Sequence, residues 1–285
     1  MKKIALFTAI LVVSAGTFAQ NNGTLHLVTG QKYVVENKVT TKSTSEMQGQ
    51  SMETNADIAT TYAIEVKDLV DNNYNMTNSI SVIKMNMSSM GHDMNFDSDK
   101  KEDMDGDIGS KFKNLINQPK PVVMDKSGNI IVSKVIDTTK ADDPDAQTAM
   151  LMKQMGGDPA ELGYGAKMAF MTIPSNAKTG TSWKDSTSAD GVTRVTNYTI
   201  KDLKGNTATI SVSGTENRDT KMEMNSMEIN TKTTGKFTGE ETVDVTTGII
   251  VQNNLTADAS GTIYVMGQEI PTKVTATSVT TVKPI

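Results

Sequence analysis

Long stretches of this chain alternate between polar and apolar side chains, and this two-residue period limits the possible folds more than any other feature of the sequence. The alternation is clearest over residues 33–39, 58–66 and 80–87. A two-residue period places successive side chains on opposite faces of a pleated strand that is buried on one side. The sequence therefore predicts a mainly β protein.

Turn-forming residues separate the alternating stretches. Gly and Asn adopt the positive φ of tight hairpins, so most strands should be antiparallel neighbours. The first strands would cover 31–47, 52–68, 74–88 and 93–99, which is long against a usual strand of about 5–6 residues. Because sheets of long strands coil, we expect long curved antiparallel strands in a half-barrel or open barrel. The predicted turns are Gln48-Gly49-Gln50, Asp71-Asn72-Asn73, Met90-Gly91-His92, Lys126-Ser127-Gly128-Asn129, Asp190-Gly191, Lys204-Gly205-Asn206, Thr247-Gly248, Ser260-Gly261 and Met266-Gly267-Gln268.

The middle of the chain has a helical pattern instead. Apolar residues recur at helical spacing over residues 149–155, after an acidic stretch that suits a helix N-terminus. A second short helix is predicted over 159–171, and a further helical turn over 110–116. A short helical segment over residues 137–175 should therefore join two β-rich parts.

The two β-rich parts resemble each other in sequence. Three matches occur in the same order: 61–69 with 80–82 against 197–203 with 210–212, the Lys-Met-x-Met-x-Ser-Met string at 84–90 and 221–227, and the turn at 127–132 against 247–251. These matches predict an internal duplication. The alternative is that threonine-rich strands with glycine turns look alike through composition alone. The predicted division is a first half over 20–136, a connector over 137–175 and a second half over 176–285, with the halves forming one structural unit.

The N-terminus has the three regions of a secretory signal peptide. Lys2 and Lys3 precede an apolar run over residues 4–13, and the small residues Thr17 and Ala19 suit the −3 and −1 positions of a cleavage site. The run is too short for the roughly 20 residues that span a bilayer, and no cysteine is present for a lipid anchor or a disulfide. We expect residues 1–19 to be removed, and a soluble product without a transmembrane segment in the periplasm or outside the cell.

Several short motifs resemble an uncharacterised family of exported Gram-negative proteins. They are a Gly-x-x-Tyr opening strand at 30–33, Phe-Asp-Ser at 96–98, Asp-x-Ser-Gly-x-Ile at 125–130 and Gly-x-x-Trp at 180–183. The resemblance implies a fold and no mechanism. A looser likeness is to LolA/LppX-type periplasmic lipid-binding half-barrels, which implies a curved antiparallel sheet and helices that close a hydrophobic cavity.

The composition argues against several classes of function. A net charge of −5 without a visible basic patch argues against nucleic acid as a partner. Only two histidines exist, His26 and His92, so the common hydrolase arrangements have little material and we expect no enzyme and no cofactor. The acidic run at 97–107 resembles a calcium loop, but Lys101 and Phe112 occupy positions that need acidic ligands, which favours a solvated loop.

Nineteen methionines give three alternatives. In the predicted meander, the turns at 48–51 and 89–92 lie at the same end of the sheet and gather thioethers near an imidazole, which are ligands that suit Cu(I). Methionines could also line an adaptable apolar groove, or simply fill gaps in a core with few aromatics. The candidate metal ligands are Met47, Met90, Met94 and His92. The candidate ligand-binding residues are Met85, Met87, Met150 and Met155.

The sequence thus favours an exported, non-enzymatic envelope protein that binds a lipid-like or other apolar ligand in a groove of the curved sheet. The alternative is a structural or protein-interaction module of the cell envelope. Periplasmic handling of Cu(I) is a third hypothesis.

Overall fold

The computed structural model describes residues 23–47, 49–89, 91–133, 163–189, 191–224 and 227–285, and most of them form long β-strands. The elements, in chain order, are β1 Lys32–Met47, β2 Gln50–Val70, β3 Asn73–Ser89, β4 His92–Asp97, α1 Lys101–Asp105, α2 Asp107–Phe112, β5 Lys120–Asp125, β6 Ile130–Ser133, α4 Tyr164–Ala169, β7 Ser182–Ala189, β8 Val192–Lys204, β9 Thr207–Met224, β10 Met227–Asp244, β11 Ile249–Val265 and β12 Gln268–Pro284.

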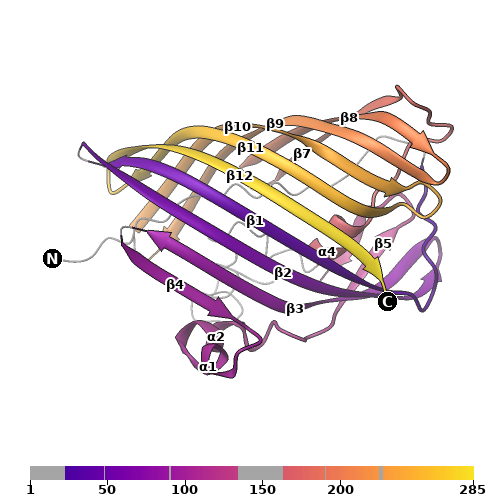
Figure 1. Ribbon diagram of the computed structural model, residues 1–285, viewed down its shortest axis with the longest axis horizontal. Helices are drawn as coiled ribbons and strands as arrows, with labels where there is room; N and C mark the ends of the chain where they lie inside the picture. Colours follow the sequence, from indigo (N-terminus) through magenta and orange to yellow (C-terminus); the bar gives the residue numbers. More distant parts are fainter. Residues whose placement is uncertain (1–22, 48, 90, 134–162, 190, 225–226) are drawn as a thin grey trace.

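The strands form one antiparallel 12-stranded sheet that curves strongly without closing (Figure 1). Its order is β6-β5-β3-β2-β1-β12-β11-β10-β9-β8-β7, and β4 also pairs with β3. The first and last long strands, β1 and β12, lie side by side in the middle, so β6 and β7 are the two edges. The expectation of long curved antiparallel strands in an open barrel is confirmed.

Most of the predicted turns join neighbouring strands, and one does not. Ser260-Gly261 lies inside β11 rather than in a turn. A side chain at Gly261 would collide with the Lys232 carbonyl of β10, so this glycine allows close contact between strands. The alternation continues through it, which a turn would interrupt.

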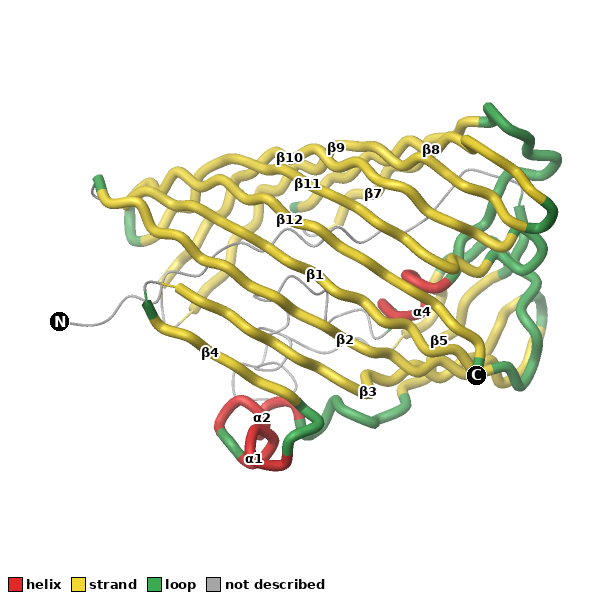
Figure 2. Tube along the Cα trace, viewed as in Figure 1, coloured by secondary structure: helices red, strands yellow, loops and turns green. Residues whose placement is uncertain are grey.

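The helices are short. Residues 149–155 lie outside the described part of the chain, whereas α4 falls within the predicted helix over 159–171. The helical turn expected over 110–116 is found slightly earlier, as α2, and α1 was not predicted. In Figures 1 and 2, α4 lies inside the curve of the sheet, where it contacts β1, β2, β3 and β11. None of the helices in the described ranges has the length and apolar character needed to cross a membrane.

The same hydrogen bonds open both halves. Gly30 donates its N–H to the carbonyl of Val66 at 2.7 Å, and Gly180 donates to the carbonyl of Ile200 at 2.8 Å. In each case a return bond, of 3.0 or 2.9 Å, runs to the carbonyl of the residue after the glycine. Both glycines have positive φ, +84° and +88°. The two halves therefore start with the same local geometry.

The strand register corrects one detail of the sequence match. Counted from these shared bonds, the residue equivalent to Tyr198 is Ile64, which faces Tyr33 as Tyr198 faces Trp183. The match of Tyr62 with Tyr198 is thus displaced by two residues. The boundaries at 136 and 176 stay predictions.

A single strand of the second half replaces two strands of the first. β3 pairs with β4 over its last six residues and with β5 over its first six, and the chain between them forms α1 and α2. In the second half, β10 pairs with β9 along its whole length. The helical excursion therefore interrupts the strand of the first half that corresponds to β10.

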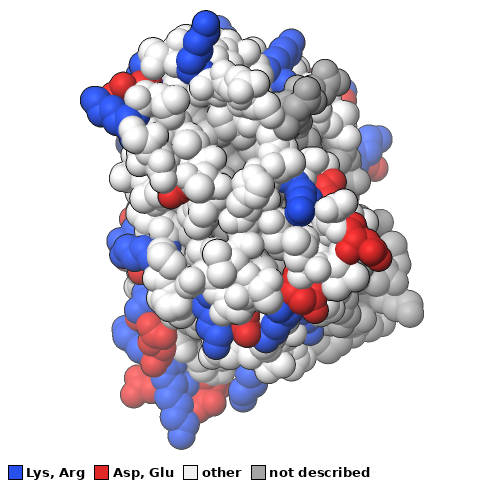
Figure 3. Space-filling view, turned by 90° about the vertical axis from the view of Figure 1, so that its right-hand side faces the viewer, with Lys and Arg blue, Asp and Glu red and all other residues white. Residues whose placement is uncertain are grey.

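The N-terminal segment ties the two halves together at one end. Leu25 donates to the carbonyl of Lys126 (2.7 Å) and His26 donates to that of Thr247 (3.1 Å), so the segment bridges the β5–β6 and β10–β11 turns. The buried Tyr74 hydroxyl donates to the Leu25 carbonyl at 2.9 Å. Figure 3 looks onto the end of the molecule that lies at the right in Figure 1, where uncharged residues make up most of the surface.

Candidate functional site

The concave face of the sheet carries two apolar clusters. The first surrounds β1, β2, β3 and α4, and the second lies on β8 to β12. Inward-facing residues are buried and alternate with exposed ones along β1 and β12. The sheet therefore has an apolar inner face and a solvated outer face, as the two-residue period predicts.

Charged residues interrupt the second cluster on its concave side. Arg194 of β8 is only 8% exposed, and its Cζ lies 4.1 Å from the centre of the Phe237 ring. The ring fits because Gly214 of β9, which lies opposite Phe237, has no side chain: a Cβ there would collide with the ring. The guanidinium therefore lies over β10, held by a cation–π contact.

Among the described residues, Glu216 of β9 is the acidic partner of this arginine. Its Oε2 lies 3.9 Å from Arg194 Nη1, whereas its Oε1 lies 3.1 Å from Arg218 Nη2. The shorter contact satisfies Arg218. Burial lowers the pKa of Arg194 and the charge of Glu216 opposes this, yet an arginine stays protonated at neutral pH.

Two donor atoms of Arg194 are unpartnered. Within the described part of the chain, Nε and Nη2 are buried without a hydrogen-bond partner. These two nitrogens lie on one edge of the planar guanidinium, the edge that can hold two oxygens of a carboxylate or phosphate. The arrangement can therefore bind an anion.

Glu241 of β10 is fully buried. Its Oε1 accepts a hydrogen bond of 3.0 Å from Asn253 Nδ2, and its Oε2 has no partner among the described residues. Burial raises the pKa of Glu241 to about 8, against the charge of Arg194, which lowers it. The carboxyl group is thus mostly protonated at pH 7 and carries little charge.

Glu241 begins a row of polar residues that crosses the concave face. Cross-strand pairing connects Glu241, Asn253, Thr280 and Asn37 on β10, β11, β12 and β1. Cross-strand neighbours Glu241 and Asn253 are hydrogen bonded, and Asn37 Oδ1 accepts 3.1 Å bonds from the hydroxyls of Thr280 and Ser278. The inner face is therefore apolar with defined polar positions, as ligand sites commonly are.

Two of the four candidate ligand-binding methionines, Met85 and Met87, lie on β3 in the first half. Met85 is fully buried in the first cluster and faces Phe96 across the strands, and Met87 is half-buried and packs against the same cluster. Met150 and Met155 lie outside the described residues. A role of these methionines in ligand binding stays a prediction.

Three of the four candidate copper ligands, Met47, Met94 and His92, lie at one end of the sheet on different strands, and the register separates Met47 from His92. Met90 lies outside the described residues; Met47 faces Gln50 at the β1–β2 turn, and Met94 faces Met87. His92 pairs with Ser89 on β3, and Ser89 pairs with Thr54 on β2. Thr54 lies four residues along β2 from Gln50, the partner of Met47, so His92 and Met47 are offset by about 13 Å along the strands. No group of three or more His, Cys, Asp and Glu side chains in the described ranges could hold a metal. Copper binding stays a prediction that this register does not favour.

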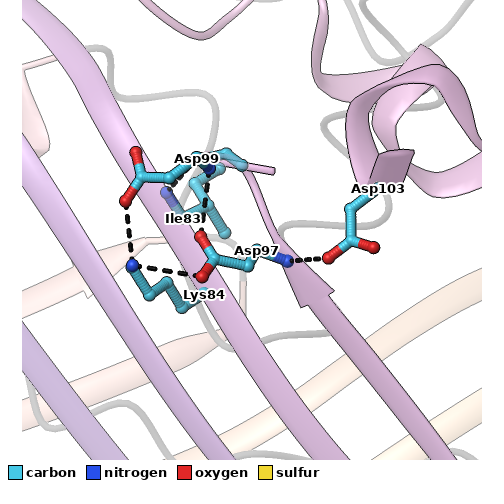
Figure 4. Close-up of polar contacts among 6 residues, drawn as sticks. Ile83, Lys84, Asp97, Asp99 and Asp103 are labelled. Atoms are coloured by element: carbon cyan, nitrogen blue, oxygen red, sulfur yellow. Dashed lines mark hydrogen bonds and ion pairs between the residues drawn. The ribbon is translucent and has the colours of Figure 1, made fainter. Parts of the chain in front are cut away.

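The acidic run leads from β4 into α1 and makes local contacts (Figure 4). Lys84 Nζ lies 3.1 Å from Asp97 and 2.8 Å from Asp99, and Asp103 accepts a 2.7 Å bond from the Asp97 N–H. The N–H of Asp99, together with Lys84, holds the pKa of Asp97 below its ordinary value. These carboxylates connect α1 to the sheet.

A hollow of about 580 Å³ lies over β10, β11 and β12, but on the outer face. Six exposed, outward-facing residues line it, two from each strand, and they form two rows that run across the three strands. Gly235, Ala259 and Val274 lie between these rows. The outward-facing residues are Thr234, Lys236, Asp258, Ser260, Lys273 and Thr275. This hollow is polar at its rim and separate from the concave face.

The sequence pattern could have indicated the three charged residues of the concave face, Arg194, Glu216 and Glu241, which we call the charged cluster. Arg194, Glu216 and Glu241 occupy inward positions of the same alternation that buries Tyr198, Val212 and Val243. Charged residues are unusual at the strand positions that point to a buried apolar face. Looking for charges at apolar positions would have selected these three residues, which the search for known motifs missed.

Comparison with solved structures gives a likeness in fold. A structure titled for lipid–protein interactions in lipovitellin matches with a TM-score of 0.52 and 10% identity, over 90% of this chain and 25% of the lipovitellin chain. An outer-membrane channel from Pseudomonas putida F1 (TM-score 0.26, 8% identity, 92% and 98% coverage) and the translocator domain of the autotransporter NalP from Neisseria meningitidis (0.35, 9%, 90% and 89%) are more distant. The chain thus spans a quarter of lipovitellin and shares a fold with that part.

Sequence comparison gives the family. No curated protein matches the chain. A family model described as a family of unknown function, DUF6263, matches residues 71–250, which is more than half of the chain and covers β3 to the start of β11. This chain therefore belongs to the DUF6263 family of unknown function.

Proposed function

We propose that this protein is an exported, non-enzymatic envelope protein that binds a lipid-like or other apolar ligand against the concave face of its sheet. The observation that carries the proposal is the open sheet itself, whose curved inner face bears both apolar clusters while its edges β6 and β7 stay apart. An open curved sheet can admit a long molecule along its concave side.

Two further observations support this function. The inward positions in the middle of the sheet carry small side chains: Ala257 faces Ala276 across β11 and β12, and Gly235 faces Ala259 across β10 and β11. Ala257 and Ala259 belong to the second cluster, so this part of the apolar inner face is built from small side chains. The lipovitellin structure, with which this chain shares its fold, is titled for lipid–protein interactions.

The proposal is tested by filling the middle of the concave face. Ala276→Leu adds bulk at an inward position, and Thr277→Leu adds it at the next, outward position of the same strand. With the uncharged fluorescent probe N-phenyl-1-naphthylamine, Ala276→Leu should weaken binding several-fold and Thr277→Leu should not. Circular dichroism and thermal melting select variants that keep the fold.

Absence of probe binding by the unaltered protein would contradict the proposal and favour a structural or protein-interaction module. Equal binding by the unaltered protein and both variants would place the ligand elsewhere.

A further inference from the structure

Arg194 is a buried cation that the fold leaves incompletely paired. Glu216 lies 3.9 Å from its Nη1, on one side of the guanidinium, while Nε and Nη2 on the other side have no partner among the described residues. Leaving charged donors buried and unpaired is costly, so proteins rarely keep them without a use. The unpaired edge calls for an acceptor that carries two oxygens.

The surroundings of Arg194 suit an anion of modest charge. Arg218 shares Glu216 with Arg194, and the buried Asp185 of β7 lies opposite Thr196, the next inward position on β8. The formal charges of the two arginines and of the two carboxylates, Glu216 and Asp185, sum to zero. Glu241 adds little negative charge, because burial keeps it mostly protonated. An anion would therefore be held by the guanidinium edge rather than by a surplus of positive charge.

The position of Arg194 also connects it to apolar surface. Its guanidinium lies over Phe237, and Phe237 faces Ala257 on β11, which in turn faces Ala276 on β12. A chain lying across this row would have its apolar part over small and aromatic residues and its end beside the guanidinium. A head group and a tail would thus find partners along one line of the concave face.

We propose that Arg194 binds the carboxylate or phosphate head group of an anionic amphiphile whose apolar tail lies across β10, β11 and β12. This inference rests on the proposed function and narrows it to a class of ligand. The guanidinium supplies two parallel N–H donors from Nε and Nη2, and the ring of Phe237 holds it in place. An uncharged lipid has ester oxygens but no anionic pair of oxygens for a charge-assisted bidentate contact with this edge.

The test compares cis-parinaric acid with its methyl ester, which has the same tail and an uncharged head group, on the full mature protein. A charge-assisted bidentate contact should make the acid bind at least about tenfold more tightly than the ester. Arg194→Gln should abolish that preference and leave binding of the ester unchanged, and Arg194→Lys should keep part of it. Lys236→Gln, which removes a positive charge from the outer face of β10, is the matched control and should behave like the unaltered protein.

Other outcomes separate this inference from the proposed function. Equal binding of acid and ester by the unaltered protein would overturn the Arg194 site and leave the proposed function standing, whether or not the Arg194 variants fold. Binding of neither probe would overturn both. Competition by acetate or inorganic phosphate at the concentrations at which decanoate competes would show a site for free anions, and would overturn the assignment to an amphiphile.

Discussion

Glu241→Gln should remove a pH dependence of stability that the buried carboxyl group creates. Glu241 is fully buried and its pKa is raised from 4.5 to about 8. A group whose folded pKa is raised binds its proton more tightly in the folded state, so its stabilisation is complete below pH 4.5 and is lost as the pH rises towards 8. Glutamine is neutral at every pH and keeps an acceptor for Asn253. The free energy of unfolding of the variant should therefore not depend on pH through this side chain.

The size of the effect follows from the linkage relation. Each pH unit between the unfolded and folded pKa reduces the free energy of unfolding by up to about 1.4 kcal/mol. Between pH 5.5 and 7.5 the free energy of unfolding of the unaltered protein should therefore fall by about 2 kcal/mol relative to that of Glu241→Gln. This value is below the full linkage value because water that enters around the carboxyl group weakens the effect of burial. Any other group that changes its protonation in this range affects both proteins equally and cancels in the difference.

The assay is urea unfolding of both proteins at pH 5.5, 6.5 and 7.5, followed by circular dichroism. Glu240→Gln is the matched control, because Glu240 faces outward on the same strand and pairs with the exposed Lys201. Its profile should run parallel to that of the unaltered protein. Parallel profiles for Glu241→Gln as well would refute the reasoning, since they would mean that Glu241 is ionised in the folded state at pH 7.

Three further predictions concern the end of the sheet where the N-terminal segment bridges the β5–β6 and β10–β11 turns, and the N-terminus itself. Tyr74→Phe removes the buried hydroxyl that bonds two backbone groups of the N-terminal segment, and should lower the free energy of unfolding by about 2 kcal/mol in urea titrations; a loss below about 0.5 kcal/mol would mean that water replaces the hydroxyl. Gly248→Ala should cost more than Gly180→Ala by thermal melting, because both glycines have positive φ but only at Gly248 would the new Cβ collide with the packed N-terminal segment; equal losses would contradict that packing. N-terminal sequencing of the exported protein should begin at Gln20, and an intact Met1 in the exported fraction would rule out the predicted cleavage.

The periodicity of the sequence was enough to predict the first four strands. The alternation across 33–39 and 58–66 reflects burial of one face only, so the strands β1 to β4 lie close to their predicted positions. Gly261 was misread because a glycine that allows close strand contact and a glycine that makes a turn look alike in sequence. The pairing of β1 with β12 joins residues more than two hundred positions apart, and no local pattern reveals it.

The charged cluster depends on that long-range arrangement. Arg194, Glu216 and Phe237 come from three strands, and only the register brings the guanidinium over the ring. Sequence reasoning looked for known ligand sets and so turned to the methionines and His92. The phase of the alternation predicts that these charges face inward, but not which of them meet.

Native mass spectrometry of the mature protein, before and after extraction with organic solvent, tests the central claim most directly. The account predicts a protein peak carrying an additional mass that extraction removes, with the released molecule identified as an anionic amphiphile and its amount reduced in Arg194→Gln. A folded protein of bare polypeptide mass, purified gently from its own compartment and unable to take up an amphiphile afterwards, would contradict it.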